Sequence, residues 1–208
     1  MTILGNLYAI SAPSGGGKTS LVQRLLTRVD SIQVSVSHTT RPKRSREVDG
    51  KDYYFIDEKQ FLYMLAENTF IEHAKVFDHY YGTSKNWLEE TLRQGIDVVL
   101  EIDWQGAAQI RKLIPKTVGI FILPPSRETL ESRLRHRGQD SDAVIAGRLN
   151  KASEEISHFG EYDYLIVNDD FDRAVQDLTS IVLAERLKTE KQQIKQQDLL
   201  KEFIKTSV

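Results

Sequence analysis

The sequence of 208 residues contains no cysteine, which excludes disulfide bonds, thiolate metal sites and cysteine nucleophiles. Its formal net charge of -2 provides no bulk attraction to nucleic acid or to an anionic membrane. No apolar run approaches the length that spans a bilayer, and the N-terminal segment lacks the basic region and the cleavage site of a signal peptide. We therefore expect a cytoplasmic protein with no nucleic-acid or membrane partner.

The apolar segments that are present are short and continuous, as in parallel strands that are covered on both faces. They lie at residues 7–10, 98–102, 120–123 and 164–167. Apolar residues at helical spacing follow at 21–29 and at 145–159. Alternating strands and helices predict an α/β fold in which a parallel sheet forms the middle of three layers.

Two segments interrupt this alternation. Residues 38–88 are rich in arginine, tyrosine, aspartate and histidine, and they are expected to form an inserted α+β lobe after a half-exposed strand at 32–37. Residues 126–159 carry clustered arginines and predict a helical lid. The core would then comprise residues 1–37, 89–125 and 160–208. An amphipathic helix predicted at 181–204 could pack on the core or on a second subunit, so an oligomer stays open.

A glycine-rich segment at residues 11–19 fits the Walker A spacing, with alanine where glycine is more usual. Glycines let backbone N–H groups converge on phosphate oxygens, and the helix that follows adds the positive end of its dipole. Lys18 can reach the β- and γ-phosphates. A glycine-rich turn with an exposed lysine is the plainer alternative, and the loop alone does not separate kinase, hydrolase and switch. The predicted ATP-binding loop comprises Ala12, Pro13, Ser14, Gly15, Gly16, Gly17, Lys18 and Thr19.

Carboxylates follow the apolar strand at 98–102. Because strand side chains alternate with period two, Glu101 and Asp103 are expected to share one face. In phosphate-loop proteins a carboxylate at such a strand end holds the Mg²⁺ shell. The alternative is a pair of solvated acids at a strand terminus. We predict that Thr19 and Asp103 bind Mg²⁺, partly through water.

Six blocks in order make the sequence resemble the guanylate kinase family over essentially the whole chain. They lie at residues 35–44, 49–55, 70–74, 80–83, 101–106 and 166–170. Six ordered blocks are far more specific than one phosphate loop. The resemblance implies a phosphate-loop fold that transfers the γ-phosphoryl group of ATP to GMP in line, with Mg²⁺ as cofactor.

The resemblance also implies residues for the second substrate. A guanidinium fork matches phosphate geometry, and one carboxylate, Glu72, can accept both the N1–H and the exocyclic amine of guanine. Adenine would turn a lone pair towards that carboxylate. Singly, these residues could form a basic turn, core aromatics or an exposed strand. Those expected to hold the GMP phosphate are Arg41, Arg44, Tyr53 and Tyr81, and those expected to read guanine are Ser37, Glu72 and Thr83, with Asp103 nearby.

Several lid arginines are expected to close on the phosphates of ATP. Arg133 and Arg137 lie one helical turn apart, and a helix end at Gly138 would let the chain double back. A solvated basic helix face is the alternative. A phosphate acceptor is already anionic near neutral pH because its second pKa is about 6, so no general base is needed. The resemblance implies Lys18, Arg41, Arg137 and Arg148 in catalysis, with Arg133, Arg137 and Asn168 on ATP.

Three other readings fit parts of the sequence. A guanylate-kinase-like domain that has lost catalysis could bind protein ligands, although Lys18 and Thr19 are retained. A related kinase could use another acceptor, although Ser37, Glu72 and Thr83 suit guanine. A hydrolase or switch would consume nucleotide without an acceptor.

Overall fold

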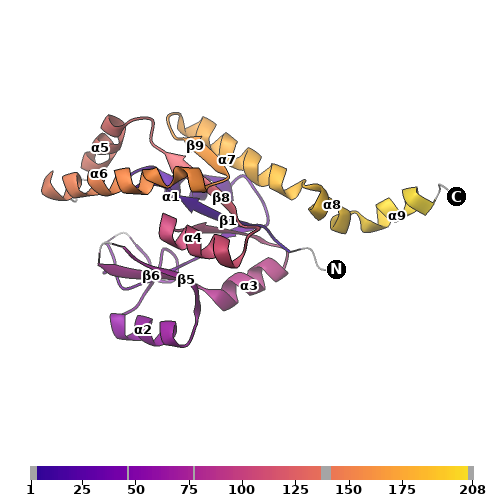
Figure 1. The fold of residues 1–208 in the computed structure, drawn as a ribbon, viewed down its shortest axis with the longest axis horizontal. Helices are drawn as coiled ribbons and strands as arrows, with labels where there is room; N and C mark the ends of the chain where they lie inside the picture. The colour runs from indigo at the N-terminus through magenta and orange to yellow at the C-terminus, as the bar shows by residue number, and fades with distance from the viewer. Residues whose placement is uncertain (1–3, 46, 77, 137–141, 206–208) are drawn as a thin grey trace.

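A computed structural model describes residues 4–45, 47–76, 78–136 and 142–205 of the chain. Its core is a five-stranded sheet in the order β2-β7-β1-β8-β9 (Figure 1). All four strand pairings are parallel. The strands are β1 (Leu7–Ser11), β2 (Ile32–Val34), β7 (Asp97–Glu101), β8 (Val118–Leu123) and β9 (Tyr164–Val167).

Helices cover both faces of this sheet. On one face α1 (Lys18–Leu26) and α7 (Phe171–Arg186) pack through buried aliphatic side chains such as Leu21 and Leu178. On the other face lie α3 (Lys85–Arg93) and α4 (Trp104–Leu113), in a second cluster that includes Leu88 and Ile110. Burial on both sides is why β1 is buried at every position. The predicted α/β fold with a parallel sheet is confirmed.

A second sheet of four strands stands beside the core, in the order β4-β3-β6-β5. Its strands are β3 (His38–Thr39), β4 (Tyr54–Phe55), β5 (Phe70–Val76) and β6 (His79–Ser84). The β5–β6 and β3–β6 pairings are antiparallel, whereas β3 and β4 are parallel. Helix α2 (Glu58–Ala66) covers this sheet through Phe61, whose ring stacks on Phe70 and Tyr80. The strand predicted at 32–37 is shorter than expected, because the chain leaves the core sheet after Val34 to reach β3.

Two helices, α5 (Arg127–His136) and α6 (Asp142–Ser157), pack against each other above the core sheet (Figure 1). Five buried side chains form their shared apolar cluster: Leu130, Leu134, Ile145, Leu149 and Ala152. After α6, the ring of His158 stacks on Trp104 at the start of α4, with centroids 3.7 Å apart. A short 3-10 helix, Phe159–Glu161, leads on to β9. Arg137 and Gly138 lie outside the described residues, so their predicted roles stay predictions.

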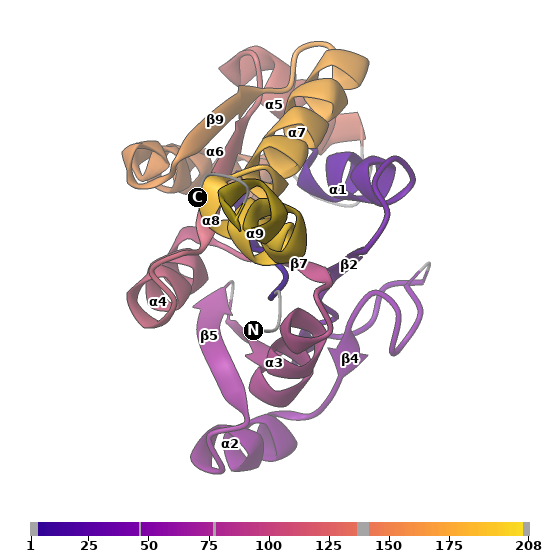
Figure 2. The same cartoon turned by 90° about the vertical axis from the view of Figure 1, so that its right-hand side faces the viewer.

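The single C-terminal helix predicted over 181–204 is wrong. Helix α7 ends at Arg186, and Lys188 has an extended backbone (φ -53°, ψ 136°) before α8 (Thr189–Lys195) and α9 (Gln197–Lys205). Both short helices lead away from the body of the molecule (Figures 1 and 2). The last residue that α7 buries is Glu185, and α8 buries none of its residues. Within the described ranges, no helix is both long enough and apolar enough to cross a membrane.

Candidate functional site

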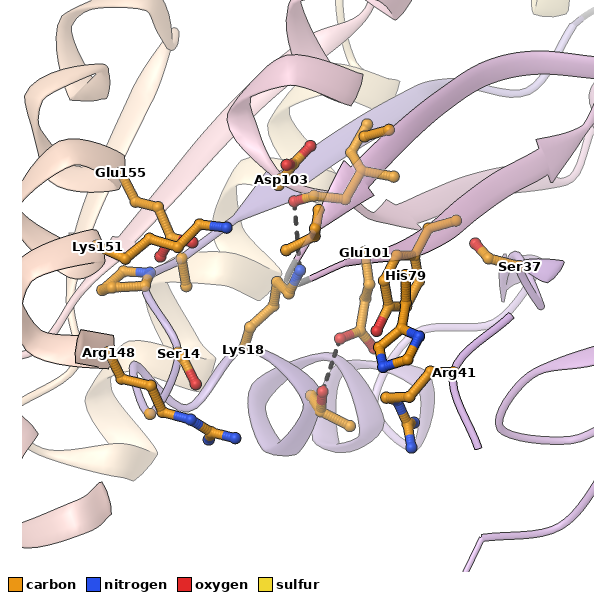
Figure 3. A pocket seen from close by; sticks show the side chains of 18 of the residues that line it. Ser14, Lys18, Ser37, Arg41, His79, Glu101, Asp103, Arg148, Lys151 and Glu155 are labelled. Carbon is orange, nitrogen blue, oxygen red and sulfur yellow. Dashed lines mark hydrogen bonds between the residues drawn. The ribbon is translucent and has the colours of Figure 1, made fainter. Parts of the chain in front are cut away.

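A cavity of about 720 Å³ opens at the carboxyl ends of β1 and β7. Its walls come from three parts of the chain. These are the phosphate loop between β1 and α1, the second sheet, and helix α6. Figure 3 shows Lys18 in the middle of this space, with Arg148, Lys151 and Glu155 on one side and Ser37, His79 and Arg41 on the other. Ligand sites of α/β proteins form at such strand ends.

The phosphate loop has the backbone that its glycines permit. Gly15 and Gly17 adopt φ values of 93° and 94°, in the left-handed region that other residues avoid. Gly17 is also the N-cap of α1, so the loop runs directly into the positive end of a helix. The side-chain amide of Asn168 donates to the Gly16 carbonyl at 2.8 Å. A Cβ on Gly17 would lie 2.2 Å from that amide nitrogen, so Asn168 braces the loop.

Lys18 and Thr19 follow the loop as the motif predicts. The Lys18 ammonium donates to the Ile102 carbonyl at 3.3 Å, and the Thr19 hydroxyl donates to Glu101 Oε2 at 2.8 Å. Both bonds are drawn in Figure 3. They join the first turn of α1 to the end of β7. The lysine therefore stands at the floor of the cavity with its charge directed into it.

Glu101 and Asp103 do not share one strand face as expected. The strand ends at Glu101, and Asp103 instead caps α4 by accepting the Gly106 N–H at 2.9 Å. Both line the cavity, but Glu101 contacts Thr19 and was not part of the predicted metal set. Among the described residues, no three His, Asp or Glu side chains form a metal-binding group. The oxygens of Thr19, Glu101 and Asp103 fit Mg²⁺, which takes few protein ligands and keeps water and phosphate oxygens.

Glu72 and Ser37 line the cavity, and Thr83, which is fully buried and is not among the lining residues, lies against both. The β5–β6 register places Glu72 opposite Thr83, whose hydroxyl donates to Glu72 Oε1 at 2.5 Å. The hydroxyls of Ser37 and Thr83 lie 3.5 Å apart. Glu72 is only 3% exposed, and burial raises its pKa to about 7 against the hydrogen bond from Thr83. Three polar side chains predicted from scattered blocks therefore form one cluster, in which Glu72 and Thr83 are buried and Ser37 is half-buried.

Arg41, Arg44, Tyr53 and Tyr81 line the neighbouring wall. The Arg41 guanidinium lies 5.4 Å from the centre of the Tyr53 ring and pairs with both oxygens of Glu47, at 2.6 and 3.1 Å. The Arg44 N–H donates to Glu47 at 2.8 Å. Burial raises the pKa of Tyr53 to about 12, so its phenol stays a donor. Two guanidinium groups and two phenols give this wall the positive charge and the hydrogen-bond donors that an anion requires.

Helix α6 presents Arg148, Lys151 and Glu155 to the cavity at spacings of three and four residues, which is one helical face. Sequence reasoning found only Arg148, although that spacing was visible. The described residues that line the cavity do not include Arg133. Its guanidinium donates to the Asn168 carbonyl at 3.0 Å, behind the phosphate loop. Glu101, His79, Lys151 and Glu155 are thus the titratable lining residues that were missed.

Known proteins support one family. The family model described as guanylate kinase matches residues 5–185. The chain is 57% identical over 204 residues to a guanylate kinase of Saccharophagus degradans, covering 98% of this chain and all of that one. It is 59% identical over 196 residues to a guanylate kinase of Legionella pneumophila, with 94% of both chains covered. A crystal structure of guanylate kinase from Anaplasma phagocytophilum has a TM-score of 0.77 and 38% identity, over 90% of this chain and 89% of that one. The chain therefore belongs to the guanylate kinase family.

Proposed function

We propose that this protein transfers the γ-phosphoryl group of ATP to GMP, giving ADP and GDP. One observation carries the proposal: a buried carboxylate flanked by two hydroxyls lies in the same cavity as a complete phosphate loop. The names and high identity of the relatives support it. The proposal includes a cytoplasmic location, where both nucleotides occur, and no nucleic-acid or membrane partner.

Glu72 is the residue that we assign to the choice of base. Guanine presents N1–H and an exocyclic amine side by side, and a carboxylate accepts both. The Ser37 hydroxyl can donate to O6, where adenine carries an amine, whereas the Thr83 hydroxyl donates to Glu72 and would have to turn to reach O6. In a buried site, unpaired polar groups on the wrong base reduce its use by about 10⁴–10⁵. Asp103 stands close to Glu72 and contributes to its electrostatics.

Arg41 and Arg44 are the proposed holders of the GMP phosphate, with the phenols of Tyr53 and Tyr81. Arg41 already binds a carboxylate in a bidentate manner through Glu47. A phosphate also offers two oxygens to a guanidinium fork, and it carries a higher charge. The acceptor oxygen is therefore fixed relative to the loop, which is the chief requirement of an in-line transfer.

The phosphate loop from Ala12 to Thr19 is proposed to hold ATP. Its N–H groups and Lys18 would bind the β- and γ-phosphates. Thr19, Glu101 and Asp103 would hold Mg²⁺ directly or through water, and a bound Mg²⁺ neutralises the charge that spreads over the transferred group. Arg148 would approach the same phosphates from α6. No general base is required, because the acceptor phosphate is already anionic.

Arg133, Arg137 and Asn168 are the ATP contacts predicted outside the phosphate loop. Arg137 lies outside the described residues. Arg133 donates to the Asn168 carbonyl and Asn168 donates to the Gly16 carbonyl of the loop, and neither lines the cavity formed by the described residues. We therefore assign these two residues to the support of the phosphate loop, and Arg148 to direct contact with ATP.

An assay of ADP formation with a panel of acceptors tests the proposal. GMP should support turnover, whereas AMP, UMP, ribose 5-phosphate and water should each be slower by about 10³ or more. Lys18→Ala supplies the inactive control. ATP loss without any acceptor would point to a hydrolase. Turnover with ribose 5-phosphate in place of GMP would point to another kinase, and no turnover at all would favour a binding module.

A further inference from the structure

Glu155 is a buried acid on α6 that the proposed transfer does not use. It is 8% exposed and lines the cavity, whereas its neighbour Glu154 is exposed. Figure 3 shows Glu155 and Lys151 reaching from α6 towards Lys18 and the phosphate loop. A buried carboxylate is rare unless cations or donors accompany it. Its surroundings therefore indicate what holds it there.

Charged groups from three elements surround this carboxylate. Burial raises the pKa of Glu155, while Lys151 on the same helix and Lys18 on α1 act in the opposite direction. The backbone of Ser14 in the phosphate loop also favours the ionised form of Glu155, and Asp103 at the start of α4 opposes it. Glu155 thus lies in the electrostatic field of two ammonium groups and of the phosphate loop.

The phosphates of a nucleotide require the same partners. Lys18 and the N–H groups of the loop are the groups that a phosphate loop offers to phosphate oxygens. A carboxylate that interacts with them is an anion already present at the edge of the anion site. It repels phosphates that bind beside it, and it lowers the free energy of the cations when the phosphates leave.

We propose that Glu155 is an internal counter-ion that competes with the nucleotide for Lys18 and Lys151 and so speeds the release of ADP. The proposal rests on the phosphoryl transfer proposed above. It makes Glu155 a positioning residue that acts through the two lysines and contacts no reacting atom. The cost is weaker nucleotide binding, and the gain is faster turnover when product release limits the rate.

A purely structural role for Glu155 makes the opposite prediction. If the carboxylate only fastened α6 to the loop, its loss would loosen the site and weaken ADP binding. If it is a counter-ion, its neutralisation should strengthen ADP binding and slow ADP release. Glu155→Gln separates the two roles, because the amide keeps the size of the side chain and can still accept hydrogen bonds while the charge is gone.

The test measures ADP binding by calorimetry with Mg²⁺ present and GMP absent, and ADP dissociation by stopped-flow displacement of a fluorescent ADP analogue. For Glu155→Gln we expect the Kd for ADP and the dissociation rate each to fall roughly tenfold. The matched control Glu154→Gln, one residue away and exposed, should leave both unchanged. Equal or weaker ADP binding by Glu155→Gln would overturn the proposal.

A second variant guards against a folding defect. Glu155→Asp keeps the charge but withdraws it by one methylene, so it should tighten ADP binding by less than Glu155→Gln does. Circular dichroism melts confirm that each variant is folded at the assay temperature. Weaker ADP binding by both variants would overturn the proposal. The binding measurements need no GMP, so their failure is distinct from failure of wild-type protein to phosphorylate GMP.

Discussion

Replacing Glu72 with glutamine should raise the free energy of unfolding of the substrate-free protein. The same replacement should weaken the recognition of guanine. Burial raises the pKa of Glu72 to about 7, from an ordinary value of 4.5. Between these two values the folded protein holds a proton that the unfolded chain has released. The free energy of unfolding therefore falls as the pH rises through this window, and the whole loss is present above pH 7.

The magnitude follows from the difference between the two pKa values. At 1.36 kcal/mol for each pH unit, ionised Glu72 costs about 3 kcal/mol at pH 8 and under about 1 kcal/mol at pH 5. A glutamine carries no charge, and its oxygen can still accept the Thr83 hydroxyl. Its new N–H₂ group needs a partner, which offsets part of the gain. We expect Glu72→Gln to be more stable than wild type by about 1–3 kcal/mol at pH 8.

Urea denaturation of both proteins at pH 5 and pH 8 checks this. The difference between them isolates residue 72, since the other groups titrate in both. The exposed Glu154→Gln should show no such gain. Glu72→Gln should also lose about 10²–10⁴ in kcat/KM for GMP, because guanine loses up to two charge-assisted hydrogen bonds. Equal stability at pH 8, or a gain that does not change with pH, would refute the reasoning.

Three further changes have defined outcomes. Gly106→Ala should raise the KM for GMP roughly tenfold, because the new Cβ would lie 2.6 Å from Glu72 Oε2. The control Gly160→Ala should leave that KM unchanged, because its Cβ would meet nothing within 4 Å in the described part of the chain. Arg41→Gln should raise the same KM about tenfold to 150-fold and leave ADP binding unchanged in calorimetry. Arg186→Met should lower the free energy of unfolding, measured in urea, by about 3 kcal/mol, because it leaves the buried Asp97 carboxylate without its ion-pair partner. The control Arg173→Met changes an exposed arginine and should leave the free energy of unfolding unchanged.

The core of the fold could be predicted because its signals are local. Continuous apolar runs mark β1, β7, β8 and β9, and a glycine loop before an amphipathic stretch marks α1. The tail was wrong for a physical reason. An amphipathic pattern says that a face could be buried, but not whether the sheet extends far enough to bury it. The last buried residue of α7 is Glu185, α8 has no buried residue, and the helix breaks between them at Lys188.

The candidate site shows the same division. Glu72 and Thr83 lie eleven residues apart, and only the β5–β6 register brings their side chains together. Period-two alternation would put Glu101 and Asp103 on one face only if β7 continued, but Asp103 ends the strand by capping α4. Asn168 was predicted to contact ATP, and a sequence block does not reveal that its amide donates to the Gly16 carbonyl.

The apolar cluster shared by α5 and α6 has a mechanical consequence. Because this pair has its own small core, separate from the two clusters on the central sheet, it can swing as one rigid body. Pro124 and Pro125 stiffen the chain at one end of that body, and the Trp104–His158 stack fastens the other. Opening would have to separate those two rings and also break the bond from Arg133 on α5 to the Asn168 carbonyl, so an engineer who wants a faster cycle would change these contacts and leave the leucines alone.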